Sequence, residues 1–131
     1  MYARSPAAQA AYEAALRDTR AAWRAVEDAI RVRVFKWDRI RGTDGRWIAI
    51  RPIFGGWRRR HLEPNPYPYE VPAGTEHWIL WSDKPMTPDA VDLYLDQKAP
   101  ARFTGWIWEQ NPPEARSVPG LWHIQVYFTK E

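Results

Sequence analysis

The sequence predicts an α+β fold: a mostly antiparallel sheet of about four strands, with a long N-terminal helix and a second, shorter helix packed on it. Three observations support this prediction. Apolar side chains recur at alternating spacings of four and three through the first 41 residues, which is the period of one helical face. Four short apolar runs follow and have the composition of strands. A second helical segment separates the second run from the third, so the order of elements favours helices on one face of an antiparallel sheet.

The N-terminal helix begins after Ser5, because a serine followed by proline at the first helical position is a common N-terminal cap. We predict helix over about residues 6–41. Val32 and Val34 would also suit a strand, so the segment after Ile30 is open to either structure. The residues that form the apolar stripe are Tyr12, Leu16, Thr19, Trp23, Val26, Ile30, Val34 and Trp37.

Four strands and a second helix are predicted in the rest of the chain. Residues 46–51 form a short strand that a proline ends. Residues 76–82 are apolar with polar flanks, which indicates a buried central strand. The helix over 87–98 begins with a threonine cap followed by proline. Two more strands, at 105–109 and 121–128, are joined by a loop that contains prolines.

The length of 131 residues fits a single domain, residues 1–131, made of an N-terminal helical segment (1–41) and a sheet segment (42–131). Segment 52–74 has five prolines and three glycines, and we predict a long surface loop there. The chain has no cysteine, so it has neither a disulfide framework nor a thiolate metal site, and we expect an intracellular, cytoplasmic location. No run of about 20 apolar residues is present, so no membrane-spanning helix is expected.

Two parts of the chain match the motifs of a known family. In residues 65–81, a Pro-Tyr dipeptide leads through a proline-containing turn to His77, three further residues and Trp81. Near the C-terminus, residues 108–112 and 116–123 include a Ser-Val pair that precedes a histidine-containing strand. With these motifs the chain resembles the N-acetylglucosamine-induced protein family, small domains of unknown function found in fungi and other microbes. The family name implies a regulatory link to an amino sugar but no demonstrated chemistry.

The last predicted strand departs from the family pattern at one position. The resemblance implies two alternating histidines there, whereas this chain has His123 followed by Gln125. A metal or acid–base role that needs both imidazoles is therefore not expected. No standard ligand spacing for a metal is present elsewhere, so we predict no metal site and no cofactor.

Alternation along the last strand places His123, Gln125 and Tyr127 on one face. That face is either a row that contacts a ligand or an ordinary solvated face of the sheet. In a ligand site, Arg116 would make a bidentate contact with an anionic group, and His123 and Gln125 would orient that group. Trp108 would add apolar contact. The predicted ligand-binding residues are Trp108, Arg116, Ser117, His123, Gln125 and Tyr127.

No catalytic motif is recognised, and His77 and His123 are the only candidates for proton transfer. Phosphoesterases that use two histidine-containing strands place a hydroxyl residue two positions after each histidine, whereas Ile79 and Gln125 stand there in this chain. A lone imidazole beside indoles is more often a structural hydrogen-bonding group than a catalyst. The sequence therefore favours a non-catalytic protein.

A basic patch of Arg58, Arg59 and Arg60 follows two glycines and Trp57. It would suit a phosphate backbone, an acidic protein or simply solvent. Because the formal net charge is only +3, nucleic acid is not the favoured partner.

Aromatic residues make up 15% of the chain, which raises the question of whether some of them serve a ligand. Tyr67, Tyr69, Trp106 and Trp108 would either form a platform for a sugar ring or fill the core.

The preferred prediction for function is a non-catalytic binding or adaptor domain. Its recognition surface would combine the loop over 52–74 with Arg116, Ser117 and the His123 face, and its partner would be a protein or a small polar or anionic ligand. Two alternatives stay open. One is a hydrolase or transferase that acts on a sugar or phosphate compound through His77 and His123. The other is a subunit of a larger protein assembly.

Overall fold

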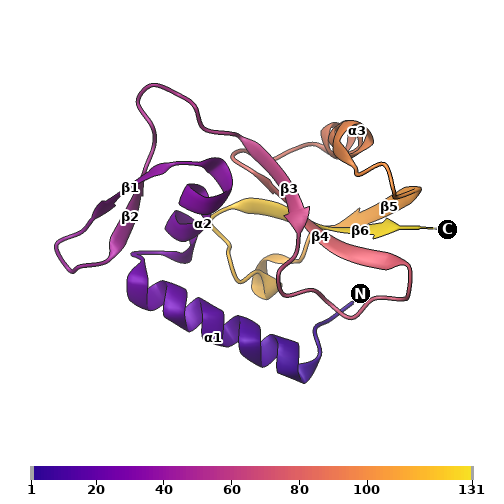
Figure 1. Ribbon diagram of the computed structural model, residues 1–131, viewed down its shortest axis with the longest axis horizontal. Coiled ribbons are helices and arrows are strands. Elements are labelled where there is room, and N and C mark those ends of the chain that lie inside the picture. Colours follow the sequence, from indigo (N-terminus) through magenta and orange to yellow (C-terminus); the bar gives the residue numbers. More distant parts are fainter. Residues whose placement is uncertain (1, 131) are drawn as a thin grey trace.

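The computed structural model of the protein describes residues 2–130. Within that range the chain has an α+β fold with three α-helices and two antiparallel sheets (Figure 1). No helix in this part of the chain combines the length and the apolar character that a membrane crossing requires. The helices are α1 (Pro6–Ala22), α2 (Val26–Phe35) and α3 (Pro88–Lys98), with a short 3₁₀ helix, η1 (Pro113–Ala115). The strands are β1 (Asp38–Arg41), β2 (Trp47–Ile50), β3 (Arg60–Pro64), β4 (Thr75–Ser82), β5 (Gly105–Glu109) and β6 (Trp122–Thr129).

The larger sheet has the strand order β3-β4-β6-β5, and all neighbouring strands are antiparallel. The apolar run predicted as a central strand is β4, which pairs with β3 on one side and with β6 on the other. The register between β4 and β6 sets His77 opposite Tyr127, Ile79 opposite Gln125, and Trp81 opposite His123. These three pairs share one face of the sheet, because side chains alternate along each strand.

The N-terminal segment departs from the prediction of helix over 6–41, because the chain forms two helices and a strand there. The backbone is extended at Trp23 (φ −125°, ψ 147°) and at Ala25 (φ −148°, ψ 153°), where α1 ends and α2 begins. Trp23 pairs with Trp47 of β2 instead of continuing α1. α2 ends at Lys36, whose φ of 64° is left-handed. Since apolar side chains of both helices face the sheet, the stripe continues across the break and does not reveal it.

The predicted strand at 46–51 does not join the larger sheet. It forms β2, which pairs with β1 in a separate two-stranded sheet. The fourth strand of the larger sheet is β3, which lies inside the segment predicted to be loop, 52–74. An edge strand needs hydrogen bonds on one side only, so its charged residues and Pro64 are tolerated there.

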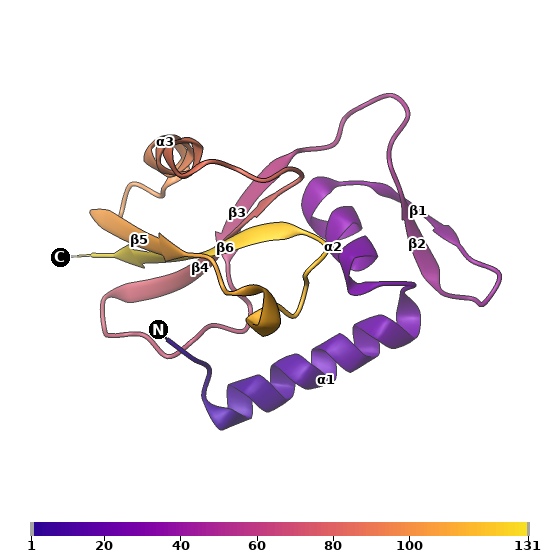
Figure 2. The ribbon, with the colours of Figure 1, turned by 180° about the vertical axis from the view of Figure 1, so that it is seen from behind.

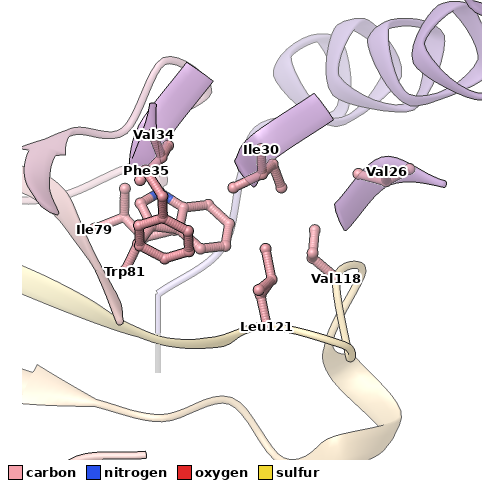
Figure 3. Packing of buried hydrophobic residues seen from close by; sticks show 8 residues of the cluster. All are labelled: Val26, Ile30, Val34, Phe35, Ile79, Trp81, Val118 and Leu121. Carbon is pink, nitrogen blue, oxygen red and sulfur yellow. The ribbon is translucent and has the colours of Figure 1, made fainter. Parts of the chain in front are cut away.

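Helices cover both faces of the larger sheet, not one as predicted. In Figures 1 and 2, α3 lies on one side of the sheet and α1 and α2 lie on the other. Trp78 and Leu80 of β4 pack in the same cluster as residues of α3, whereas Ile79 and Trp81 pack with α2. Because β4 is apolar on both faces, each face needs its own helical cover. The cluster on the α2 side consists of Val26, Ile30, Val34, Phe35, Ile79, Trp81, Val118 and Leu121 (Figure 3).

Candidate functional site

The helix α1 is amphipathic, yet none of its side chains is fully buried. Ser5 starts the helix, because its Oγ accepts a hydrogen bond from the N–H of Ala8 (3.1 Å). The inner face of the helix lies over a cavity of about 570 Å³ instead of being sealed against the core. Four side chains of this face line the cavity, together with Trp23 directly after the helix: Tyr12, Ala15, Leu16 and Thr19.

The floor of the cavity is the sheet face that carries the β4–β6 pairs. Ile79 and Trp81 of β4 and His123 and Gln125 of β6 line it. α2 forms an adjoining wall, and Figure 3 shows its Val26 and Ile30 facing Val118 and Leu121 from the loop before β6. Other parts of the wall come from residues 63–69 and 111–118. The cavity therefore lies between the first two helices and the strand face on which a ligand row was predicted.

Arg4 brings a positive charge to the cavity immediately before α1. Its Nε donates a hydrogen bond to the carbonyl oxygen of Tyr67 (2.6 Å). Its guanidinium carbon lies 4.0 Å from the ring centroid of Tyr12 and 4.9 Å from that of Tyr69, so it is held by cation–π contact on two rings. No carboxylate of residues 2–130 lies within ion-pair distance of Arg4, so no acidic side chain in that range neutralises its charge.

The other polar groups of the lining are tied to one another. The hydroxyl of Tyr12 donates to Oγ of Ser117 (2.7 Å), which joins α1 to the loop before β6. Arg33, the second arginine of the lining, forms an ion pair with Glu63 (2.7 Å). The charge of Arg33 is thus balanced by Glu63, whereas no acidic group in the described part of the chain balances that of Arg4.

His77 is buried, and both of its ring nitrogens are engaged. Nδ1 accepts a hydrogen bond from the N–H of Tyr69 (2.9 Å), so Nε2 carries the proton and donates to Oε1 of Gln125 (2.6 Å). Burial lowers the pKa of His77 to about 4, although the bond to Gln125 acts in the opposite direction. The rings of Tyr69 and Tyr127 pack on the imidazole with centroid distances of 4.3 and 5.1 Å. His77 is therefore a neutral group held in place by the structure, with no nitrogen left for proton transfer.

His123 lines the cavity and differs from His77 in its free nitrogen. Its Nδ1 donates to the carbonyl oxygen of Leu121 (2.9 Å), which leaves Nε2 as an unprotonated acceptor. Burial lowers the pKa of His123, so the imidazole is neutral near pH 7. The two histidines lie opposite different partners, Tyr127 and Trp81, and make no hydrogen bond to each other. This geometry gives no support to a reaction that uses both imidazoles.

Three of the six predicted ligand-binding residues, Ser117, His123 and Gln125, line the cavity together. Tyr127 is buried on the same sheet face but does not reach the lining, and its hydroxyl donates to Oε1 of Glu109 (2.8 Å). Burial, together with that carboxylate, raises the pKa of Tyr127 well above its usual range. The face of β6 with His123, Gln125 and Tyr127 is therefore not an ordinary solvated face. His123 and Gln125 line the cavity and can reach a ligand there, but Tyr127 cannot.

The other two predicted residues do not join the site. Trp108 packs with the α3-side cluster on the opposite face of the sheet, and its Nε1 donates to Asp92 (3.0 Å). Arg116 donates from Nε to the carbonyl oxygen of Asn111 (2.7 Å) and so braces the loop around η1. The placement of Trp108 follows from the register of β5 with β6, which sets it opposite Val126, and that of Arg116 follows from loop closure. Local sequence defines neither of these.

The four aromatic residues considered as a sugar platform are likewise divided between the two faces. Tyr67 and Tyr69 line the cavity, whereas Trp106 and Trp108 pack in the α3-side core.

The basic patch of Arg58, Arg59 and Arg60 does not line this cavity, and its three side chains make different contacts. Nε of Arg58 donates to the carbonyl oxygen of Val34 (2.6 Å) near the C-terminus of α2, so this side chain is a structural anchor. Arg59 lies 3.5 Å from Asp83, and Arg60 begins β3. A second hollow, of about 540 Å³, is lined by Arg51, Arg59, Arg60, Ser82, Asp83 and Lys84.

Within residues 2–130, no three or more His, Cys, Asp or Glu side chains are grouped so that they could hold a metal ion.

Several residues of the cavity were not selected from the sequence, and Tyr12, Thr19 and Arg4 are among them. Tyr12 belongs to the predicted helical stripe, and its hydroxyl, like that of Thr19, was a usable signal, because such groups are less frequent on a helix face that is sealed in a core. Arg4 gave no signal, since a single arginine before a helix cap has no characteristic pattern.

Comparisons with known proteins address the fold and the family. No curated protein matches the chain at the threshold used for the search. The crystal structure of HTC1 is similar, with a TM-score of 0.64 and 16% sequence identity over 99% of this chain and 77% of that chain. At this identity the similarity shows a shared fold. The family model described as "Protein of unknown function (DUF3605)" matches residues 1–129, and the chain therefore belongs to the DUF3605 family.

Proposed function

We propose that this protein is a non-catalytic binding domain, and that its ligand is a small molecule with an apolar body and an anionic or strongly polar group. The observation that carries the proposal is the cavity of about 570 Å³ between α1, α2 and the sheet. Its volume falls within the range of about 300–1,000 Å³ that is usual for small-molecule sites. Its lining also has the usual composition, with aromatic and aliphatic side chains around a few polar groups.

The polar groups of the lining also favour a ligand. The space is a pocket that is partly open to solvent, as small-molecule sites usually are. Its lining includes Arg4, which forms no ion pair among residues 2–130, and His123, whose Nε2 is an acceptor. Water would contact these groups in the free protein, and a ligand with matching polar atoms would displace it.

The lining suggests a role for each part of a ligand. Nη2 of Arg4 would bind an anionic oxygen, since Nε already donates to the carbonyl oxygen of Tyr67 and Nη1 donates to Oε1 of Gln9 (3.4 Å). His123 would accept a hydrogen bond from a ligand hydroxyl or amide, and Trp81 would contact an apolar ring. Turnover is not part of the proposal, because His77 has no free nitrogen.

The resemblance to N-acetylglucosamine-induced proteins makes amino sugars and their phosphates the first compounds to test. A phosphorylated sugar would combine a ring for contact with indole and an anionic group for Arg4. Nucleotides and aromatic carboxylates have the same combination and form the other arms of the test.

The experiment is a thermal-shift screen of these compounds against two tryptophan variants of α1. Ala15→Trp places an indole in the cavity, whereas Ala10→Trp adds the same group to the exposed side of the same helix. A true ligand at 100 times its Kd stabilises the wild type by about 2.7 kcal/mol, roughly 10 °C for a domain of this size. We expect Ala15→Trp to abolish the shift and Ala10→Trp to keep it, with circular dichroism verifying that both variants fold.

A second variant tests the chemistry of the ligand. Arg4→Gln should weaken an anionic hit by at least about tenfold, as expected for the loss of a charge-assisted hydrogen bond. Arg17→Gln, which removes an exposed arginine outside the cavity, should leave the affinity unchanged. A panel without hits, or a hit that Ala15→Trp still binds, would contradict the proposal.

A further inference from the structure

The loop between β2 and β3 carries the two most exposed large apolar side chains of residues 2–130. Ile53 is 88% exposed and Phe54 is 98% exposed. Gly55 and Gly56 follow with φ of 76° and 81°, left-handed values that turn the chain back at this point. Figures 1 and 2 both show the loop arching away from the two sheets. Neighbouring apolar side chains at a projecting tip are unusual, because solvent exposure of such a pair is unfavourable.

The base of this loop is held firmly, so its tip is presented outward by the structure. Two guanidinium groups lie against the ring of Trp57, with the carbon of Arg51 5.1 Å and that of Arg59 4.3 Å from its centroid. The same indole packs edge-on against Trp37 (5.6 Å) beside the α2-side core. The backbone N–H of Arg58 also donates to the carbonyl oxygen of Phe35 (3.0 Å). These contacts bring the two ends of the loop together below Ile53 and Phe54.

A basic hollow adjoins the base of the loop. Four cationic side chains and one carboxylate line it, and two of the cations, Arg51 and Arg59, are the ones that flank Trp57. The only ion pair within it is the 3.5 Å contact between Arg59 and Asp83, as judged over the described part of the chain. The surface beside the apolar tip is therefore strongly positive. The lining is Arg51, Arg59, Arg60, Ser82, Asp83 and Lys84.

We propose that this loop docks on an anionic lipid bilayer. Ile53 and Phe54 would enter the boundary between headgroups and acyl chains, and the basic hollow would contact lipid phosphates and carboxylates. Apolar side chains at an interface with adjacent Arg and Lys are the combination that peripheral membrane binding requires.

The geometry favours a bilayer over the other partners of a basic patch. A stable protein interface buries about 800 Å² on each partner, which a two-residue tip does not offer. Single-stranded nucleic acid would stack its bases on aromatic rings, and the tip offers one such ring, Phe54, beside the aliphatic Ile53, on which a base does not stack. Membrane insertion needs only a few apolar side chains together with a positive charge.

The test is co-sedimentation with phosphatidylcholine vesicles and with mixed phosphatidylcholine–phosphatidylserine vesicles. We expect binding to the anionic vesicles that weakens as salt is added. The double variant Ile53→Ser/Phe54→Ser should lower the affinity by at least about tenfold, because each buried CH₂ contributes about 0.8 kcal/mol. Leu93→Ser/Ile107→Ser is the matched control, since it removes two other exposed apolar side chains (60% and 51%) and should bind like the wild type.

A second pair of variants tests the contribution of the basic hollow to vesicle binding. Arg59→Ser/Arg60→Ser should lower the affinity by roughly 30-fold, at about fivefold for each charge, and should flatten the salt dependence. Arg17→Ser/Lys98→Ser removes two exposed cations far along the chain from this loop and should change the affinity by less than about twofold.

A fluorescent probe tests insertion directly. The chain has no cysteine, so Phe54→Cys gives a single site for an environment-sensitive dye. The emission should shift to the blue on anionic vesicles, whereas the same dye at Leu93→Cys should not respond. The proposal would be overturned by wild-type protein that ignores anionic vesicles, by equal binding of Ile53→Ser/Phe54→Ser, or by binding to RNA or polyglutamate in place of vesicles.

Discussion

Nε2 of His77 lies 2.6 Å from Oε1 of Gln125, across the two central strands of the larger sheet. The N–H of Tyr69 occupies the other ring nitrogen, so the loop before β4 is fastened to the sheet through one imidazole. Gln125 stands where the N-acetylglucosamine-induced proteins, which this chain resembles, often have a second histidine. Here its side-chain oxygen accepts the hydrogen bond that His77 donates. This buried pair makes the stability of the fold depend on pH.

We expect acid to destabilise the protein through His77. Its pKa in the folded state is about 4, below the value near 6.5 of an unfolded histidine, so the unfolded chain binds the extra proton first. The contribution is fully present above pH 6.5 and is lost as the pH falls towards 4, which amounts to about 2–3 kcal/mol by pH 4.5. Urea unfolding at pH 7 and pH 4.5 measures the loss.

His77→Asn is the control for this titration, because its side-chain oxygen can still accept the N–H of Tyr69 but does not titrate. The variant should lose less stability than the wild type between the two pH values, by about 2 kcal/mol. His61 and His123, whose pKa values are also lowered mainly by burial, contribute equally to both proteins. Equal losses in the two proteins would show that His77 does not stay neutral.

Removal of the side-chain amide of Gln125 should lower the free energy of unfolding for a reason other than titration. Gln125→Leu leaves the buried N–H of His77 without an acceptor, and we expect a loss of about 1–3 kcal/mol in the free energy of unfolding at pH 7. Gln97→Leu, on the exposed side of α3, is the matched change and should stay within about 0.5 kcal/mol of the wild type. A Gln125→Leu protein as stable as Gln97→Leu would mean that water replaces the lost acceptor.

Much of the fold could be predicted from local pattern. The central strand β4, the helix α3 and the last two strands each carry a strong signal of their own, and each was located within a few residues. The break after Ala22 could not be read, because Trp23 and Val26 keep the helical spacing while Ala25 adopts an extended backbone that no residue type enforces. β3 was missed because an edge strand with charged side chains has the composition of a loop.

The sequence predicted the residues that line the cavity from β6 and its preceding loop, but not those that line it from the helices. His123, Gln125 and Ser117 were selected from alternation along one strand and from its preceding loop, and all three line the cavity. The opposite wall comes from helices and a loop more than 40 residues away in sequence, and that juxtaposition is a tertiary property. Arg116 was selected for its charge, but its hydrogen bond to the nearby carbonyl of Asn111 takes it out of the lining.

Two leucines of α3 that differ in burial test the packing of the cluster on the α3 side of the sheet. Leu95 is completely buried against the sheet, whereas Leu93 is 60% exposed. We expect Leu95→Ala to lower the free energy of unfolding by about 2–5 kcal/mol, through lost apolar burial and the void that remains. Leu93→Ala should change it by less than about 0.5 kcal/mol, as measured by denaturant unfolding. Comparable effects at both positions would indicate that α3 does not pack as described.

The hydroxyl of Tyr127 should also contribute measurably. It donates to the carboxylate of Glu109 within 2.8 Å, and hydrogen bonds to charged groups contribute about 1.5–3 kcal/mol. Tyr127→Phe should therefore destabilise the protein by about that amount. Tyr94→Phe removes a hydroxyl that has no hydrogen-bond partner among residues 2–130, and its effect on the unfolding midpoint should be small.

The 17 residues of α1 lack a single buried side chain, so this helix is joined to the rest of the protein by a few contacts near its start and along one face. Such an element can detach while the remainder stays folded, and its amides would then exchange hydrogen for deuterium much faster than those of β4 or β6. A molecule in the cavity would contact the helix and the sheet at once and would slow that exchange. Binding of a molecule in the cavity and attachment of α1 to the sheet would then be coupled, so that hydrogen exchange in α1 would report how much of the protein holds a ligand.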